Sequence, residues 1–372
     1  MRSSPRVVVV GGGITGCAVA YALALEGARV LVLEGEAIGS KASGVAAGLL
    51  LPLGESERPG PFLSLALESF HLHRTFTPEV GRRSGVDPHL VAQPVLYPAF
   101  DAQEVAALEE HARWQESVGA GLRAAVVDGA EARRLEPRLS SEAVAALVSY
   151  DEAHVDAYRL VLALARAAEG LGAEFRYAEA TGLRTRGGRV ASVRHARGEE
   201  PCDLVALCMG PWTVRAGEWL GAPLPVEPLR GQLLRLEVPG PPLQTVVFHE
   251  GGYVVHKPSG TTLAGTTEER AGFAPWPTEE GRRQIMTAAL RLVPSLAEAG
   301  VAGAVAGLRP ISPDGLPILG RVPGWDNALV ATGAGRNGVL LAPITARAMA
   351  DLALEREPSV RLGPFDPARF LG

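Results

Sequence analysis

Lysine is nearly absent from this chain of 372 residues. Lys41 and Lys257 are the only two, and the other basic residues are arginines that form no long run. The formal net charge is −5 at pH 7, so the composition offers no excess of positive charge of the kind that neutralises many phosphates. These features exclude a nucleic acid as the expected partner.

Cysteine is also scarce. Cys17, Cys202 and Cys208 are an odd number and form no C-x-x-C pair, which argues against both a disulfide framework and a zinc site. The histidines show no metal-ligand spacing, so we expect no metal. Unpaired cysteines are typical of a reducing compartment, and we expect a cytoplasmic protein.

Long apolar runs are missing as well. The run Val7–Val10 ends at Gly11, and it is too short for the core of a signal peptide or for a membrane span. We therefore expect no membrane partner. The chain is nevertheless 47% hydrophobic, and its 44 glycines and 29 prolines are too few for a low-complexity sequence. The composition predicts a folded protein with one large domain or two interleaved ones.

The first residues show the pattern of a dinucleotide-binding unit. The β-branched run Val7–Val10 predicts a strand that is buried on both faces. An Ala/Leu-rich helix over 17–26 and a second strand over 29–33 follow it. An ordinary glycine turn is the alternative for the loop between them, but the complete strand–turn–helix–strand context favours dinucleotide binding. This loop has the spacing G-x-G-x-x-G, formed by Gly11, Gly13 and Gly16.

Each glycine of this spacing has a physical task. Gly11 permits the tight turn, Gly13 lets the backbone approach a pyrophosphate, and Gly16 allows close packing of the helix. The helix start adds N–H donors and a positive dipole end, from Ile14 and Thr15. These five residues are therefore candidates for cofactor binding.

Further segments predict which dinucleotide binds and where it lies. Glu34 ends the second strand, where a carboxylate would accept hydrogen bonds from ribose hydroxyls and repel a 2′-phosphate, so we expect FAD or NAD. The small-residue stretch over 41–50 suits a backbone that threads beside a large flat ligand. A strand over 328–332 runs into a second glycine-rich turn and a helix with Pro343 in its first turn. The candidates in these segments are Ser43, Ala46, Ala47, Gly48, Leu49, Gly335, Asn337, Gly338 and Val339.

Specific motifs extend from end to end of the chain. They are VGGGITG at 10–16, AAGLL at 46–50, HVD at 154–156, CMGPW at 208–212, RGQ at 230–232, GLRP at 307–310, DGLPILG at 314–320 and GRNGVLLAP at 335–343. In these motifs the chain resembles the FAD-dependent amine oxidoreductases of the D-amino acid oxidase type, most closely the bacterial glycine oxidases of thiamine biosynthesis. The resemblance implies FAD as the cofactor and places Gly210 and Trp212 in a loop that contacts the flavin.

The resemblance also implies how the flavin is held. Family members with a covalent flavin attach it through a histidine in the segment matching 42–48, or through a cysteine after the arginine matching Arg309. Neither residue stands in this chain. We therefore expect FAD to be bound without a covalent bond.

The remaining pattern predicts the domain organisation. Short strands over 232–237, 245–249, 253–256 and 261–264 are separated by proline and glycine, which is typical of an antiparallel sheet. We predict an α/β protein with a discontinuous, Rossmann-like FAD-binding domain built on a parallel sheet. An antiparallel sheet with helices, over 102–118 and 277–292 among others, forms an inserted substrate-binding domain. The FAD-binding domain comprises 1–90, 150–222 and 306–372, and the substrate-binding domain comprises 91–149 and 223–305.

Oxidation of an amino acid by a flavin needs a planar cation for the substrate carboxylate. Arg309 is the candidate because it follows a small-residue strand over 302–307 and precedes Pro310, so we expect it at a strand end that faces the site. An arginine that anchors a surface loop is the alternative. Tyr253 is a candidate hydroxyl donor to the same carboxylate, with a half-buried aromatic on a strand as its alternative.

The second glycine-rich turn contains two further polar candidates. Arg336 stands beside the expected flavin, where it caps the substrate or steadies the loop. Asn337 and Gly338 stand at the expected helix start, where their N–H groups would point at the pyrimidine edge of the flavin. A simple N-cap is the alternative for Asn337.

The resemblance implies oxidative deamination of glycine or another small amino acid or amine. Hydride passes to flavin N5, water hydrolyses the imine, and oxygen reoxidises the flavin to give hydrogen peroxide. A D-amino acid or sarcosine oxidase and a quinone-linked amino acid dehydrogenase are alternatives in the same class. An NAD-dependent dehydrogenase and a flavin-binding protein without catalysis are alternatives from other classes. The sequence leaves open whether the chain forms a homo-oligomer.

Overall fold

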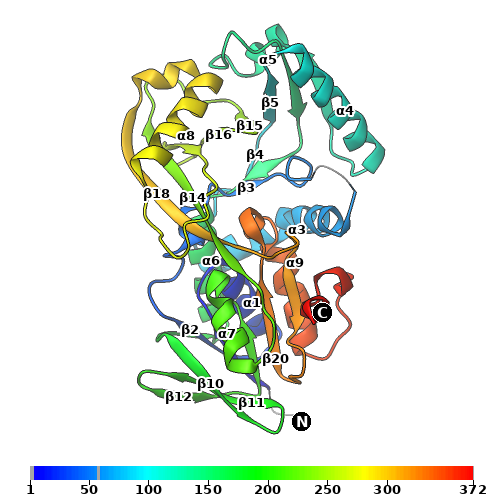
Figure 1. Ribbon diagram of the computed structural model, residues 1–372, viewed down its shortest axis with the longest axis vertical. Coiled ribbons are helices and arrows are strands. Elements are labelled where there is room, and N and C mark those ends of the chain that lie inside the picture. The colour runs from blue at the N-terminus through cyan, green and yellow to red at the C-terminus, as the bar shows by residue number, and fades with distance from the viewer. Residues whose placement is uncertain (1–3, 57–58, 372) are drawn as a thin grey trace.

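The computed structural model of the protein describes residues 4–56 and 59–371. Its lower half in Figure 1 is built on a six-stranded sheet with the order β19-β20-β13-β1-β2-β9. Neighbouring strands are parallel except for β19 and β20. The strands are β1 (Arg6–Val10), β2 (Arg29–Glu34), β9 (Glu174–Tyr177), β13 (Leu204–Leu207), β19 (Ile318–Arg321) and β20 (Ala328–Thr332).

Both faces of this sheet are covered, as the β-branched run in β1 predicts. Val7 and Val9 belong to the core beneath the helices on one face, whereas Val8 and Val10 belong to a second core on the other face. The second face is covered by helix α7 and a small antiparallel sheet. These elements are α7 (Thr213–Leu220), β10 (Ala180–Arg186), β11 (Arg189–His195) and β12 (Gly198–Pro201). The arrangement is the predicted Rossmann-like fold.

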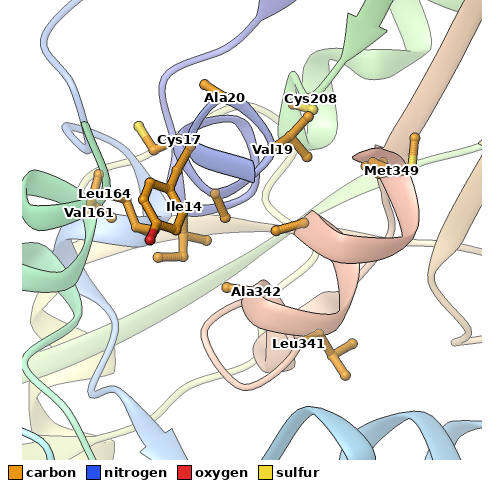
Figure 2. Close-up of a cluster of buried hydrophobic side chains, with 14 of the residues drawn as sticks. Ile14, Cys17, Val19, Ala20, Val161, Leu164, Cys208, Leu341, Ala342 and Met349 are labelled. Atoms are coloured by element: carbon orange, nitrogen blue, oxygen red, sulfur yellow. The ribbon is translucent and has the colours of Figure 1, made fainter. Parts of the chain in front are cut away.

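Figure 2 shows how the helix after the first glycine turn, α1, is enclosed. Val161 and Leu164 of α6 lie on one side of α1, and Ala342 and Met349 of α9 lie on the other. Small side chains on α1, among them Cys17 and Ala20, let both neighbours approach closely. The helices in this layer are α1 (Ile14–Leu25), α3 (Pro61–Ser84), α6 (Ala157–Gly170) and α9 (Ala342–Ala353).

The upper half in Figure 1 contains an eight-stranded sheet with the order β18-β14-β17-β16-β15-β5-β7-β6. It is antiparallel apart from the pair β15 and β5, as expected for the second part of the molecule. Its strands are β5 (Val95–Ala99), β6 (Ala124–Asp128), β7 (Ala145–Ser149), β14 (Glu227–Glu237), β15 (Val246–His249), β16 (Gly252–His256), β17 (Thr262–Gly265) and β18 (Gly300–Ile311). Its helices are α4 (Ala102–Val118), α5 (Gly129–Leu135) and α8 (Glu279–Leu292).

Short elements complete the structure. A three-stranded sheet with the order β3-β8-β4 connects distant parts of the chain, and a short helix, α2, follows β2. These elements are β3 (Leu49–Leu50), β4 (Val91–Ala92), β8 (Ala153–His154) and α2 (Ala42–Val45). The 3-10 turns are η1 (Gly210–Trp212), η2 (Pro294–Glu298), η3 (Gly335–Asn337), η4 (Gly363–Phe365) and η5 (Pro367–Phe370). No helix among residues 4–56 and 59–371 has the length and apolar character needed to cross a bilayer.

The expectation that Arg309 stands at a strand end is wrong. β18 continues through Arg309 and Pro310 to Ile311, and Arg309 is paired in register with Leu229 of β14. Pro310 is tolerated because β18 is the edge strand of the sheet, where one side of the backbone needs no N–H donor. The guanidinium is therefore positioned by a regular strand rather than by a loop.

Other differences concern the second glycine-rich turn and the domain boundaries. The turn leads first into η3, and α9 begins only at Ala342, so Asn337 is not the N-cap of that helix. Pro343 does stand in the first turn of α9, as predicted. The predicted boundary between residues 305 and 306 falls inside β18. The division into two domains at the stated residues stays a prediction.

Candidate active site

A cavity of about 380 Å³ brings the predicted site residues together. It lies at the carboxyl ends of β1, β2, β13 and β20, and residues of β14, β16 and β18 close it on the side of the second sheet. Ligands of open α/β sheets bind at this edge of the strands. All predicted site residues except Gly16 line the cavity.

Close backbone contacts shape the first glycine turn. Gly11 has a φ of +106°, and a Cβ on it would lie 2.3 Å from the carbonyl oxygen of Cys208. A Cβ on Gly16 would lie 1.9 Å from the carbonyl oxygen of Gly11. Gly16 therefore acts behind the cavity wall, where it lets α1 pack against the turn.

The amino end of α1 faces the cavity, and it carries the positive end of the helix dipole. Gly13 is the N-cap and provides no side-chain cap, and the first turn of the helix contains no acidic residue. Ser43 supplies the missing acceptor, since its Oγ accepts the N–H of Ile14 at 3.0 Å. A Cβ on Gly13 would lie 3.1 Å from this Oγ, so the lack of a side chain on Gly13 leaves room for a ligand beside the hydroxyl. A pyrophosphate suits such a helix start.

Glu34 is fixed by two backbone donors. Its Oε2 accepts the N–H of Gly12 at 2.7 Å and its Oε1 accepts the N–H of Glu36 at 2.8 Å. Each carboxylate oxygen has a further lone pair, which fits the predicted contact with ribose hydroxyls. Nearby, Lys41 pairs with Glu36 and places its Nζ 5.6 Å from the ring centre of Trp212. Lys41 also lines the cavity, and sequence analysis included it in the small-residue stretch without naming it as a candidate site residue.

The small-residue stretch runs along the cavity as close-packed backbone. A Cβ on Gly307 of β18 would lie 2.7 Å from Cγ2 of Val45, so α2 packs directly on the strand. Gly48 has a φ of +73°, and a Cβ on it would lie 2.2 Å from the carbonyl oxygen of Val155. The predicted residues of this stretch line the cavity, namely Ser43, Ala46, Ala47, Gly48 and Leu49.

The two glycine-rich turns adjoin in space. A Cβ on Gly338 would lie 3.7 Å from Cγ2 of Ile14, and Gly335 adopts a φ of +55°. The N–H of Asn337 donates to the carbonyl oxygen of Ala334 at 2.9 Å. The expectation that this N–H points at the flavin is therefore wrong, because the 3-10 turn already uses it.

The loop that contains Gly210 and Trp212 is anchored to the neighbouring strand. Gly210 has a φ of +54°, and its carbonyl oxygen accepts the hydroxyl of Thr332 at 2.8 Å. The ring of Trp212 lines the cavity and lies 5.6 Å, centre to centre, from the ring of Phe273. The end of β13 and the end of β20 are thereby joined at the cavity edge.

These residues fit an FAD. Backbone forms much of the wall at the turns after β1, after α2 and after β20, and a large flat ligand needs such walls free of bulky side chains. The α1 dipole suits the pyrophosphate, and Glu34 suits a ribose without a 2′-phosphate. Among residues 4–56 and 59–371, no group of three or more His, Cys, Asp and Glu side chains could hold a metal ion.

Arg309 lies at the opposite side of the cavity and is largely buried, with 16% of its side chain exposed. One terminal nitrogen donates to the carbonyl oxygen of Thr267 at 3.0 Å, and the other donates to Oγ1 of Thr266 at 2.7 Å. Gly231 makes room for the guanidinium, because a Cβ there would lie 2.3 to 2.7 Å from its atoms. These two bonds use two of the five N–H donors and hold the planar group still.

The RGQ motif explains how the partners of Arg309 are held. The N–H of Gln232 donates to Oγ1 of Thr267 at 3.1 Å, and the hydroxyl of Thr266 donates to the carbonyl oxygen of Gln232 at 3.0 Å. Glu269 accepts from Arg230 and, at 2.5 Å, from Nε2 of Gln232. The motif therefore supports the segment after β17, which in turn holds the guanidinium. Sequence analysis singled out the motif without predicting this task.

Tyr253 completes this end of the cavity. Its side chain is buried, and a Cβ on Gly265 would lie 2.4 Å from its hydroxyl oxygen, so Gly265 makes room for the phenol beside Thr266. Burial raises the pKa of Tyr253 to about 12, and the nearby Arg309 lowers it only in part. The phenol is therefore protonated at neutral pH and remains a hydrogen-bond donor. Phe248 stacks on its ring at 6.3 Å, centre to centre.

Arg336 is held by two acidic residues that sequence analysis missed. Its Nε donates to Glu55, and a terminal nitrogen lies 3.5 Å from Oε1 of Glu268. The same Glu268 oxygen lies 3.8 Å from Arg309. Burial raises the pKa of Glu55, whereas Arg336 opposes this shift. The missed signal for Glu55 is a glutamate that closely follows the apolar run over 49–53.

Comparisons with known proteins agree with this geometry. The family model described as FAD dependent oxidoreductase matches residues 6–352. The chain is similar to glycine oxidase of Geobacillus kaustophilus, with 34% identity over 370 residues that cover 98% of the chain and 97% of the relative. It is also similar to glycine oxidase of Pseudomonas aeruginosa, with 34% identity covering 98% of the chain and 99% of the relative.

Solved structures show the same similarity. The crystal structure of the Geobacillus kaustophilus glycine oxidase superposes with a TM-score of 0.94 at 32% identity, covering 99% of this chain and all of the other. The structure of iminodiacetate oxidase from Chelativorans sp. BNC1 superposes with a TM-score of 0.90 at 27% identity, covering 97% of this chain and 99% of the other. The shared fold therefore covers nearly the whole chain. The family model places the chain among FAD-dependent oxidoreductases over residues 6–352.

Proposed function

The chain belongs to the DAO family of FAD-dependent oxidoreductases, and we propose that it is an oxidase of glycine or another small amino acid. The observation that carries this proposal is the buried guanidinium of Arg309 in the same cavity as the cofactor cradle. A planar cation with unused donors pairs with a carboxylate through two parallel hydrogen bonds. Sequence relatives named glycine oxidase support a small amino acid as the substrate.

Residues of the parallel-sheet half would hold FAD. The amino end of α1 would face the pyrophosphate, Glu34 the ribose, and the backbone over 46–49 and 335–339 the flavin. When bound, FAD supplies the hydride acceptor at N5 and, in an oxidase, passes the electrons to oxygen to give hydrogen peroxide. We expect it to be bound without a covalent bond, so acid precipitation of the protein should release the yellow cofactor into the supernatant.

The remaining steps belong to the side chains at the second sheet. Arg309 binds the substrate carboxylate, and the protonated phenol of Tyr253 donates a further hydrogen bond to it. Thr266 and Thr267 keep the guanidinium from turning away. Phe248 and Tyr253 form an apolar wall that excludes water and strengthens these polar contacts. The α-carbon is thereby oriented toward the cofactor side of the cavity.

The experiment that tests this proposal is anaerobic mixing of the purified flavoprotein with glycine, sarcosine and D-alanine, followed by air. We expect at least one amino acid to bleach the flavin, and air to restore the colour with formation of peroxide. Bleaching without recovery in air would favour the quinone-linked dehydrogenase. A flavin that no amino acid bleaches would refute the proposal.

A further inference from the structure

Four charged side chains form one cluster at the substrate end of the cavity, namely Arg309, Arg336, Glu55 and Glu268. Glu55 pairs with Nε of Arg336, and Glu268 lies between the two arginines, at 3.5 Å from Arg336 and 3.8 Å from Arg309. The formal charges of the four groups sum to zero. Arg309 has additional support from uncharged acceptors in the segment after β17.

Glu55 is the more constrained of the two acids. Only 9% of its side chain is exposed, against 51% for Glu268. Its backbone N–H donates to the carbonyl oxygen of Leu51 at 3.0 Å. The preceding Gly54 lies against the hydroxyl of Tyr97, which donates to the buried Glu152 at 3.0 Å. The loop that carries Glu55 is therefore fixed from behind, and its carboxylate stays on Arg336.

This charge arrangement determines how many anionic groups the site accepts. A substrate with one carboxylate places it on Arg309 and adds no further negative charge. A second carboxylate would reach Arg336 only beside Glu55 and Glu268, where like charges repel it. If the acids were neutral, Arg336 would offer the second anion a fork of donors.

We propose that Glu55 and Glu268 make the site selective for amino acids with a single carboxylate by occupying Arg336. This inference rests on the proposed function, because it assumes that Arg309 binds the first carboxylate. Neither acid needs to touch the substrate, so both are positioning residues for Arg336.

The test compares substrates that differ only in the second carboxylate. Sarcosine and iminodiacetate are such a pair, and methoxyacetate and diglycolate are their unreactive ether counterparts. The FAD-containing wild type, E55Q, E268Q and E55D are assayed for kcat/KM on the two amines. Dissociation constants of the two ethers are measured from the change in the flavin spectrum. E131Q is the matched control, because Glu131 pairs with Arg134 on the surface of α5, outside the cavity.

We expect E55Q to raise the preference for iminodiacetate over sarcosine by about tenfold, which corresponds to ~1.4 kcal/mol. The half-exposed Glu268 is screened by solvent, so E268Q should raise it less, by about fivefold. E55D keeps the charge and should restore the wild-type preference, as should E131Q. The ratio of the two ether dissociation constants should shift in the same direction.

A preference that changes by less than about threefold in both glutamine variants, by turnover and by binding alike, overturns the inference. If E55Q does not retain FAD, the substrate preference of E268Q decides the test, because the half-exposed Glu268 can be replaced with little effect on folding. A wild type whose flavin is bleached by none of glycine, sarcosine and D-alanine would instead contradict the proposed function, and the ether binding ratio would still test the charge arrangement. The two failures are therefore distinguishable.

Discussion

Replacing Arg309 by lysine tests the substrate anchor most directly. The variant keeps the positive charge but loses the planar fork of donors. In the native site the guanidinium donates to Thr267 at 3.0 Å and to Thr266 at 2.7 Å while it lies on Gly231. A lysine ammonium has no planar face to lie on Gly231, and its rotating donors cannot reproduce both bonds together with a bidentate carboxylate.

The expected loss follows from the burial of this group. Only 16% of the Arg309 side chain is exposed, so its pairing with a carboxylate is partly desolvated. Truncating one partner of such a pair costs about 2–5 kcal/mol, which is roughly a 30- to several-thousand-fold fall in kcat/KM. The lysine variant should fall near the lower end of this range and Arg309→Ala near the upper end.

The assay measures kcat/KM for glycine, sarcosine and an amine that lacks a carboxylate, with the flavin content of each variant determined separately. The amine without a carboxylate should be oxidised about equally by wild type and variants. Arg138→Lys is the matched control, because Arg138 also donates to one hydroxyl and one carbonyl oxygen, those of Ser295 and Pro241, but lies outside the cavity lining. It should leave the kinetics unchanged.

The reasoning is refuted if both Arg309 variants retain full flavin and remain within about threefold of wild type on glycine and sarcosine. Such a result would mean that the carboxylate pairs elsewhere. Arg336 would then be the next arginine to replace, together with its partner Glu55.

Three further predictions follow from single contacts. Gly231→Ala places a Cβ within 2.3 Å of the Arg309 guanidinium and should lower kcat/KM on sarcosine by about tenfold or more at normal flavin content; unchanged kinetics would contradict the packing argument. Gly13→Val should purify with little flavin absorbance, because its side chain would fill the approach beside Ser43, and normal flavin content would rule out this assignment of the phosphate cradle. His73 is buried with a pKa lowered to about 4, so its contribution to the unfolding free energy is fully present above its unfolded pKa of 6.5 and decreases as the pH falls toward 4. Urea unfolding at pH 7 and pH 4.5 should show a larger loss for wild type than for His73→Gln, and equal losses would show that His73 does not carry this dependence.

Sequence alone located the nucleotide half of the molecule. Strand, glycine turn, helix and terminal acid are contiguous over about thirty residues, so each can be read from local periodicity and from backbone requirements at Gly11 and Gly16. The second glycine-rich turn was found for the same reason. The exact start of the helix after it was not found, because the short 3-10 turn η3 comes first and α9 begins only at Ala342.

Helix α3 was not predicted from the sequence. Pro78 stands inside it, and such a residue normally predicts a break. Burial of Phe70 and Leu65 against the core and the bond from Ser69 to the carbonyl oxygen of Leu340 stabilise the helix nevertheless. The continuation of β18 through Pro310 was also missed, because an edge position in a sheet is a property of the assembled fold.

What the sequence determined by itself is the cofactor class and the residue types of the site, since glycine spacing and an acidic strand end are local requirements of backbone and ligand. What only the tertiary structure decided is the electrostatic setting of that site. Glu55, Glu268 and Arg336 are far apart in the chain, and their charges meet only because the loop after β3, the segment after β17 and the second glycine turn converge on one cavity. Coulomb interactions depend on distance in space, and no spacing along the chain encodes that distance.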